Sequence, residues 1–361
     1  MSTIYFNPVT SIFENRPAGT ICVGVPGSGK TFFLLNVAAN CLLTSCRVIY
    51  IDPKNDALVL KEVDKNVSVI DINDIKPGAL NPFRFLKNVD SNVIMSVIKS
   101  ICGDLTDEQV IDVFPIVQDF VNANRKNLRG TDFLSLANYL YSSESRAAQA
   151  VGTVLKINED TKYGRLIFSR STDDDFDLDS TSQVISLLGL KLPKTKELSD
   201  QEERFSSAIV YLLTKRLREI LVEDNSKPTV LIIDEALMVY SNPDIAKIIE
   251  EFLALGRSLN VVVVLASQAM SHFPSNIAQF ISNKFMFGMS SKEAKLFLDE
   301  FDNSDSEYGI DRESVIHYVT NYEVGRCFFI DRKGRGGFVQ IKSNLGVTSN
   351  PLLKKRKEEK S

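Results

Sequence analysis

The run Gly24-Val25-Pro26-Gly27-Ser28-Gly29-Lys30-Thr31 fits the phosphate-binding loop pattern, in which two glycines separated by four residues precede Lys-Thr. Glycine lets backbone N–H groups turn inward around phosphate oxygens, because it has no Cβ atom to clash. Lys30 is placed to reach the terminal phosphates, and the Thr31 hydroxyl is placed to ligate Mg²⁺. The pattern therefore predicts that the chain binds ATP and Mg²⁺. The expected nucleotide contacts are Pro26, Gly27, Ser28, Gly29, Lys30, Thr31 and Phe32.

The residues around this loop have the pattern that such a site needs. Residues 20–23 form a short apolar run typical of a buried strand, and residues 32–45 form an apolar, helix-like stretch. A flexible Gly/Ser turn between a strand and a helix is the simpler alternative. Strand, loop and helix in this order favour phosphate binding, because the helix points its positive end at the loop.

A second motif follows the apolar run 229–233, which reads as a strand buried on both faces. Asp234 and Glu235 come directly after it, at the strand end where open α/β sheets bind ligands. We expect Asp234 to hold the Mg²⁺ hydration shell and Glu235 to orient and deprotonate a water near the γ-phosphate. The alternative is that both acids cap the next helix, where acidic side chains are favoured. The upstream phosphate loop favours the functional interpretation.

A third apolar run, 261–266, leads into Ser267 and Gln268. An amide at the end of a central strand can bridge the attacking water and the γ-phosphate, so we predict that Gln268 senses hydrolysis. Alone, Gln268 would read as an exposed residue that begins a loop. An acid directly after the Mg²⁺-binding Asp234 favours a hydrolase over a phosphotransferase, which must keep water out.

Composition limits the class of protein. Hydrophobic residues make up 44% and charged residues 24%, which is ordinary for a globular chain, and the net charge of −4 excludes a globally basic nucleic-acid binder. No apolar run approaches the roughly 20 residues of a membrane-spanning helix, and no signal peptide is visible. The five cysteines lack paired metal-ligand spacing, which argues against structural zinc. Unpaired thiols without an export signal predict a cytoplasmic location.

Strands and helices alternate along the chain, which predicts an α/β fold with a mainly parallel sheet flanked by helices. Residues 1–18 read as a lead-in, 19–89 and 181–342 as the core, 90–180 as a mainly helical insertion, and 343–361 as a charged tail, interpreted as a solvated end. We expect strands at 20–24, 47–52, 67–72, 183–188, 229–233, 261–266, 284–288, 325–331 and 337–341, with the last two forming a hairpin.

Polar residues mark several helix starts. Thr106 and Gln109 form a capping box that opens a helix toward Ala123, Thr131 is predicted to cap another helix, and Ser199 with Glu202 forms a second box. Ser241 or Asn242, followed by Pro243, is predicted to begin a further helix. The helix after residue 199 carries an apolar stripe and an opposite basic face, expected to be solvated, at Lys215, Arg216 and Arg218. The acidic run 173–179 lacks the glycine and glutamate of a calcium loop and is interpreted as a solvated edge.

Together these motifs resemble the FtsK–HerA superfamily of P-loop motors, most closely the motor domain of type IV secretion and conjugation ATPases. The run Ile51-Asp52-Pro53-Lys54-Asn55-Asp56 is similar to the family's acidic motif after the second strand, and the run 78–83 is similar to its Leu-Asn-Pro signature. The run 182–193 resembles a strand of the conjugative branch. Residues 256–268, from glycine and arginine to Ser267-Gln268, match a shared block, and the run 325–329 resembles the closing strand.

This resemblance implies a RecA-like P-loop NTPase core, a homo-hexamer with ATP at subunit interfaces, and an arginine supplied by the neighbouring subunit. Arg257 is the first candidate for that arginine and Arg326 the reserve; local ion pairing is the alternative for Arg257. The isolated chain could then be a monomer of low activity. It also implies that Asp52 helps to order the metal or the water.

The implied role is an ATPase that powers substrate transfer or channel assembly at the inner face of the cell membrane, through secretion-channel or membrane-anchored partners. Family members usually carry a large N-terminal domain, and we expect this chain to lack one. It would then be a motor fragment or a short relative. The alternatives are a DNA translocase or coupling protein of the same superfamily, and a nucleotide-dependent scaffold that does not hydrolyse ATP.

Overall fold

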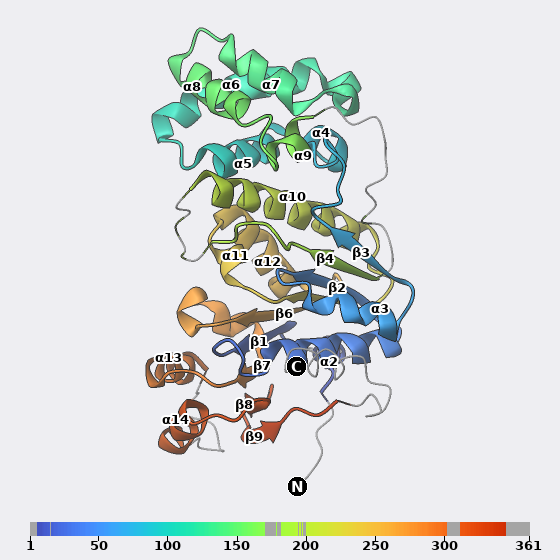
Figure 1. The fold of residues 1–361 in the computed structure, drawn as a ribbon, viewed down its shortest axis with the longest axis vertical. Helices are drawn as coiled ribbons and strands as arrows, with labels where there is room; N and C mark the ends of the chain where they lie inside the picture. The colour runs from blue at the N-terminus through green and yellow to red at the C-terminus, as the bar shows by residue number, and fades with distance from the viewer. Residues whose placement is uncertain are drawn as a thin grey trace.

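The computed structural model describes residues 6–343 except 15, 170–177, 179–181, 194, 196, 198–199 and 302–310. Within these residues, a mixed nine-stranded sheet with the order β3-β4-β2-β5-β6-β1-β7-β8-β9 runs through the molecule (Figure 1). The strands are β1 (Gly19–Val23), β2 (Arg47–Asp52), β3 (Val67–Asp71), β4 (Ser182–Ser186), β5 (Thr229–Ile233), β6 (Val261–Ser267), β7 (Ile281–Met286), β8 (Arg326–Ile330) and β9 (Gly336–Gln340).

The strands from β3 to β7 in this order are parallel, and β8 and β9 extend the sheet in antiparallel pairing. The predicted α/β fold and the predicted hairpin are therefore confirmed. The most visible difference is at β7, which begins at Ile281 rather than at residue 284, because Gly19 of β1 already pairs with Ile281. Gly334 makes the hairpin turn with a φ of 79°.

The central strands are apolar on both faces, as buried parallel strands must be. On one face Cys22, Tyr50 and Val264 pack with α2 (Lys30–Leu43). On the other face Ile21 and Leu265 belong to the core that contains α10 (Gln201–Glu223) and α12 (Pro243–Leu255). Alternation along each strand thus feeds two cores, one on each side of the sheet.

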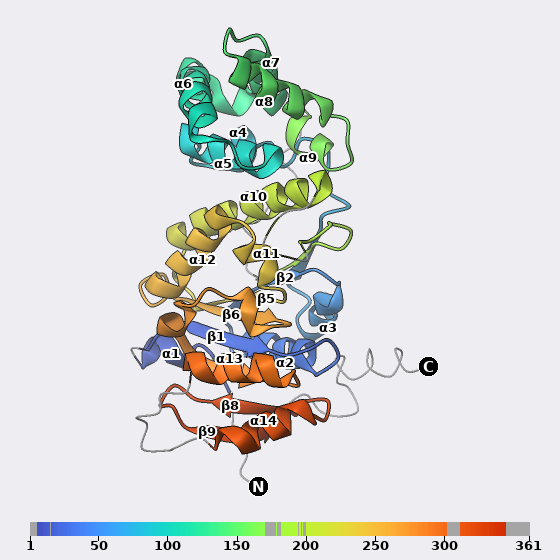
Figure 2. The ribbon, with the colours of Figure 1, turned by 90° about the vertical axis from the view of Figure 1, so that its left-hand side faces the viewer.

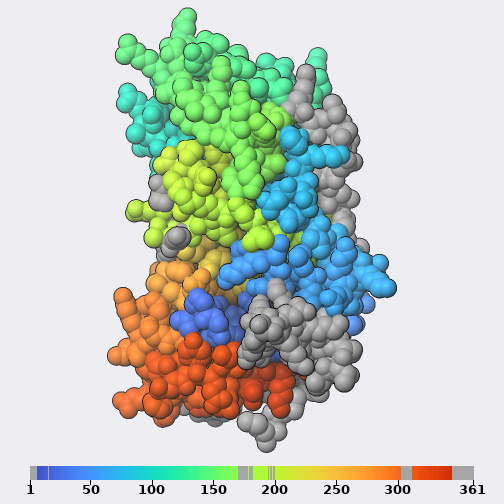
Figure 3. Space-filling model, in the orientation of Figure 1, coloured from blue at the N-terminus to red at the C-terminus, as the bar shows by residue number. Residues whose placement is uncertain are grey.

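A helical layer lies between β3 and β4 in the chain and stacks on α10, away from the sheet (Figure 2). In the space-filling view its teal and green residues gather at the end of the molecule far from β8 and β9 (Figure 3). The layer contains α4 (Pro82–Phe85), α5 (Ser91–Cys102), α6 (Asp107–Ala123), η2 (Arg125–Gly130), α7 (Phe133–Tyr141), α8 (Arg146–Ile157) and α9 (Gly164–Phe168). The division of the chain at residues 90 and 180 stays a prediction.

Shorter elements complete the described fold. They are α1 (Thr10–Phe13), η1 (Asp56–Val59), α3 (Leu60–Val63), α11 (Leu237–Tyr240), η3 (Met270–His272), η4 (Ile277–Phe280), α13 (Ser291–Phe301) and α14 (Arg312–Thr320). None of the helices in the described ranges has both the length and the apolar character needed to cross a bilayer.

Two of the predicted helix caps need correction. The capping box of Thr106 and Gln109 is confirmed, but the next helix is capped by Asp132, whose carboxylate accepts from the Ser135 N–H, and not by Thr131. An ionised carboxylate is a stronger acceptor than a hydroxyl, and it lies one residue nearer the first helical turn. Asp200 caps α10, because its carboxylate accepts from the Glu203 N–H at 3.0 Å, so the predicted box of Ser199 and Glu202 was placed one residue too early. Ser199, the acidic run except Leu178, and the tail beyond residue 343 lie outside the described residues.

The basic face of α10 was expected to be solvated, but two of its arginines pair with carboxylates. Arg218 forms a two-point ion pair with Glu251 of α12, at 2.6 and 2.7 Å, and Arg216 lies 3.5 Å from the buried Glu219. Arg218 therefore joins α10 to α12, and Arg216 stabilises a buried carboxylate.

Asn242 begins α12 and also connects three helices. Its side-chain oxygen accepts from the N–H groups of Asp244 and Ile245, at 2.9 and 3.3 Å. Its side-chain nitrogen donates to Ser100 of α5 at 3.0 Å and to Ser207 of α10 at 2.8 Å. The residue is buried, so its loss would remove a cap and two donated hydrogen bonds from a site that excludes water.

Replacing Asn242 with alanine is expected to lower the free energy of unfolding by about 2–4 kcal/mol, because the helix cap and two buried hydrogen bonds are lost together. Urea or thermal unfolding of the full chain measures this. Asn138→Ala, on the exposed face of α7, is the control and should change stability by less than about 0.5 kcal/mol. Equal stability of the two variants would contradict the connecting role.

Candidate nucleotide-binding site

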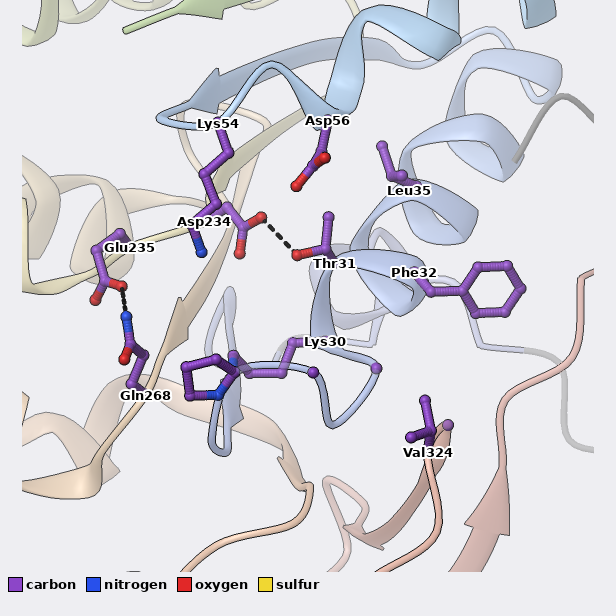
Figure 4. A pocket seen from close by; sticks show the side chains of 14 residues that line it. Lys30, Thr31, Phe32, Leu35, Lys54, Asp56, Asp234, Glu235, Gln268 and Val324 are labelled. Atoms are coloured by element: carbon purple, nitrogen blue, oxygen red, sulfur yellow. Dashed lines mark hydrogen bonds between the residues drawn. The ribbon is translucent and has the colours of Figure 1, made fainter. Parts of the chain in front are cut away.

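A cavity of about 290 Å³ lies where the carboxyl ends of β1, β5 and β6 meet, beside the start of α2 (Figure 4). The position follows from the topology, because β6 lies between β1 and β5 and all three are parallel. The lining residues are Pro26, Gly27, Gly29, Lys30, Thr31, Phe32, Leu35, Lys54, Asp56, Asp234, Glu235, Gln268, Val324 and Gly325. The loop, the two acids and the glutamine predicted from three separate motifs therefore meet in one cavity.

The glycine-rich loop has a conformation that requires glycine. Gly27 and Gly29 have φ angles of +78° and +107°, and a Cβ atom on Gly29 would lie 2.8 Å from the backbone nitrogen of Gly325. Ser28 is buried and its hydroxyl donates to the Val25 carbonyl at 2.7 Å, so it shapes the loop rather than lining the cavity. The other predicted loop residues, Pro26 to Phe32, line the cavity.

Lys30 is held inside the loop that it follows. Its ammonium group donates to the carbonyl oxygens of Gly24 and Val25, the latter at 3.1 Å. Burial lowers the pKa of Lys30, and the nearby carboxylates of Asp234 and Glu235 oppose that change. The cation thus sits next to the inward-turned loop backbone, where phosphate oxygens would lie.

The Thr31 hydroxyl donates to Asp234 Oδ2 at 3.1 Å, and Tyr50 of β2 donates to the same oxygen at 3.3 Å. Burial raises the pKa of Asp234 to about 7, while Lys54 and the Thr31 hydrogen bond act in the opposite direction. A buried carboxylate with so few compensating charges would be stabilised as an anion by a bound cation. Two oxygen ligands this close therefore fit Mg²⁺, which prefers such donors.

Glu235 lies on the opposite side of the cavity and is held at both carboxylate oxygens. Gln268 donates to Oε2 at 2.9 Å and Ser267 donates to Oε1 at 3.3 Å. The side chain is 12% exposed, and Figure 4 shows it turned toward Gln268. Glu235 does not cap the following helix with its side chain, because α11 has no side-chain cap hydrogen bond at its start.

Several lining residues were not predicted as site residues. Lys54 and Asp56 come from the loop after β2, and Figure 4 shows the Lys54 side chain directed toward Asp234. Asp52, which we expected near the metal or water, is buried and accepts from the backbone N–H groups of Lys54 and Ala57, at 2.9 and 2.7 Å. Asp52 therefore shapes the loop that presents Lys54. The motif at 51–56 correctly indicated a segment of the site, but the side chains that line the cavity are those of Lys54 and Asp56.

The two candidate arginines lie outside the cavity. Arg257 follows α12 at the edge of the sheet where β6 begins, opposite the Gln268 end, and its side chain is exposed. Among the described residues it has no ion pair, so the alternative of local pairing finds no partner there. Arg326 begins β8 next to the lining residue Gly325 and pairs with Glu323 at 3.0 Å.

The chain matches the model of the AAA-like domain family over residues 4–345. No curated protein matches the sequence significantly. Among solved structures, VirB4 of Thermoanaerobacter pseudethanolicus is similar, with a TM-score of 0.74 and 15% identity, covering 96% of this chain and 95% of that chain.

The bacterial conjugative coupling protein TrwB is also similar. Its complex with sulphate has a TM-score of 0.61 and 14% identity, covering 93% of this chain and 87% of that chain. Its complex with ADP and Mg²⁺ has a TM-score of 0.60 and 14% identity, covering 93% and 88%. The predicted resemblance to secretion and conjugation ATPases is confirmed at the level of fold. Since the family match spans nearly the whole sequence, the chain belongs to the AAA-like domain family, with a P-loop NTPase fold.

Proposed function

We propose that this protein is an ATP-hydrolysing motor of a conjugative or type IV secretion system, which powers substrate transfer or channel assembly. The observation that carries the proposal is the single cavity in which Lys30 and the Thr31–Asp234 pair face Glu235 and Gln268. Binding of ATP and Mg²⁺ alone would need only Lys30, Thr31 and Asp234. The partly buried carboxylate of Glu235, which accepts a hydrogen bond at each oxygen, adds the base that hydrolysis needs.

In this proposal the loop binds the phosphates of ATP through its backbone N–H groups, and Lys30 contacts the terminal phosphates. Pro26, Gly27, Ser28, Gly29 and Phe32 contribute contacts or shape to the same loop. Thr31 and Asp234 would hold Mg²⁺, directly or through its water ligands. When bound, Mg²⁺ neutralises the charge that develops on the phosphate oxygens.

Glu235 acts as the general base that takes a proton from the attacking water. A base must keep one lone pair directed at its proton donor, and the hydrogen bonds from Gln268 and Ser267 restrict rotation of the carboxylate. Gln268 is also placed to contact the water or the γ-phosphate from the end of β6. Its contact with Glu235 would change when the phosphate leaves, so it can report hydrolysis to the central strand.

The site is completed by a second copy of the chain. Negative charge builds on the transferred phosphoryl group, and no arginine lines the cavity in the described chain. Arg257 lies exposed at the opposite edge of the sheet, so in a ring of six subunits it would reach the cavity of a neighbour. An isolated monomer would then hydrolyse ATP poorly. The reserve candidate, Arg326, would first have to break its pair with Glu323.

The secretion context is supported by the likeness to VirB4, which extends over nearly the full length of both chains. Docking to secretion-channel or membrane-anchored proteins would hold this motor at the inner face of the membrane. The likeness to TrwB, described as a coupling protein, supports a second candidate function, a DNA translocase. The lower TM-score of that match makes it the second choice.

Glu235→Gln is expected to keep ATP binding and to lower the rate of phosphate release by at least about 100-fold, because an amide cannot accept the water's proton. Fluorescent-nucleotide titration and a phosphate-release assay on the full chain measure the two effects. Glu144→Gln, in an exposed loop of the helical layer, is the matched control and should leave both unchanged. Undiminished turnover in Glu235→Gln would rule out the base assignment.

Arg257→Ala and Glu235→Gln are expected to be inactive alone but to regain activity when mixed. In a mixed ring, a subunit with an intact Glu235 can receive Arg257 from its neighbour. The rate per subunit should also rise with protein concentration in the wild type, because the sites are shared. No recovery on mixing, with both variants still assembling, would show that Arg257 does not act across the interface.

The two candidate functions differ in their response to DNA. A secretion ATPase should show the same turnover with and without double-stranded DNA. A translocase should be stimulated, and the stimulation should fall steeply as salt increases, because phosphate contacts release counterions. Turnover measured at two salt concentrations with and without DNA decides between them.

A further inference from the structure

We propose that His272 is a positioning residue for Glu235, acting through the hydroxyl of Ser267. This inference rests on the proposed function, because it concerns the carboxylate that we assign as the general base. We call the three residues the His–Ser–Glu chain. His272 follows the end of β6 in the short helix η3 and does not line the cavity, so it would act only through its neighbours.

The geometry defines the direction of the hydrogen bonds. His272 Nδ1 lies 2.7 Å from Ser267 Oγ, which donates to Glu235 Oε1 at 3.3 Å. A hydroxyl has a single hydrogen, and an ionised carboxylate can only accept, so the serine hydrogen is used on Glu235. The serine oxygen must then accept from Nδ1–H of His272. This assigns the tautomer that carries hydrogen on Nδ1.

The His–Ser–Glu chain holds Glu235 at one carboxylate oxygen, and Gln268 holds it at the other. Gln268 donates to Oε2 at 2.9 Å, and His272 Nδ1 lies 3.9 Å from Oε1. With a donor on each oxygen, the carboxylate plane is fixed and a remaining lone pair faces the cavity. Without His272, the Ser267 oxygen would no longer accept a hydrogen bond from Nδ1–H. The hydroxyl could then rotate and donate its hydrogen to an acceptor other than Glu235.

The turn that carries His272 is itself fixed by a carboxylate from another helix. Glu293 of α13 accepts from the N–H groups of Met270 and Ser271, at 2.6 and 3.2 Å, and from the Ser271 hydroxyl at 3.2 Å. Met270 and Phe273 are buried on either side of the turn, and the His272 side chain is 24% exposed. A side chain on a turn clamped in this way has the rigidity that a positioning role requires.

The test measures kcat and KM for ATP in the full chain with His272 replaced by alanine, asparagine or glutamine. Asparagine can place an amide N–H near the position of Nδ1, whereas glutamine places it near Nε2. We expect His272→Ala and His272→Gln to lower kcat roughly tenfold or more with KM unchanged, since a hydrogen bond to a charged group is affected. His272→Asn should recover most of the wild-type kcat.

The only other histidine supplies the matched control. His317 lies exposed on α14 and contacts Asn321, so His317→Ala should leave kcat unchanged. A double-mutant cycle with Ser267→Ala adds a second test. In the Ser267→Ala background, His272→Ala should lower kcat little further, because the His–Ser–Glu chain has already lost its middle hydroxyl. Thermal unfolding of each variant shows whether the fold is retained.

Two failures are distinguishable. If wild-type protein and Glu235→Gln have the same turnover, the proposed function fails and this inference fails with it. If Glu235→Gln abolishes turnover but His272→Ala retains the wild-type kcat, or if alanine and asparagine lower it equally, only the positioning role is refuted. Additive losses in the double-mutant cycle would also refute it, because His272 would then not act through Ser267.

Discussion

The hydrogen bond between Thr31 and Asp234 is the contact on which the rest of the site depends. It joins residues 203 positions apart in the sequence, one at the start of α2 and the other at the end of β5. Because β6 separates β1 from β5 in the sheet, the contact forms only if the three strands have the observed order and register. Burial of Asp234 then makes a cation the natural partner of this pair.

The sequence predicted the strands and the loop well, for a physical reason. Continuous apolar runs such as 229–233 and 261–266 can only be buried strands in this context, and Gly29 needs a φ that other residues rarely adopt. Polar residues at strand ends then identified Asp234, Glu235 and Gln268 as neighbours. These positions were predicted because the carboxyl ends of parallel strands converge, although their chemical roles stay proposals.

Other features depended on contacts that no local pattern records. Tyr50 reads as a core residue in a strand, yet its hydroxyl reaches Asp234. The direction of Lys54 depends on Asp52 holding the backbone of its own loop and on Asn55 adopting a φ of +61°. His272 gave no signal at all, because its partner Ser267 lies five residues away around a turn clamped by Glu293.

The contact between the phosphate loop and the antiparallel edge has a mechanical consequence. Gly325 donates its backbone N–H to the Ser28 carbonyl at 3.0 Å, and its own carbonyl accepts from Ile341 at 2.8 Å, just beyond β9. The loop that would feel a change in phosphate content is therefore bonded directly to the far border of the sheet. Two backbone hydrogen bonds thus couple the loop mechanically to the terminal hairpin, so a change in the conformation of the loop would be transmitted to the antiparallel edge of the sheet.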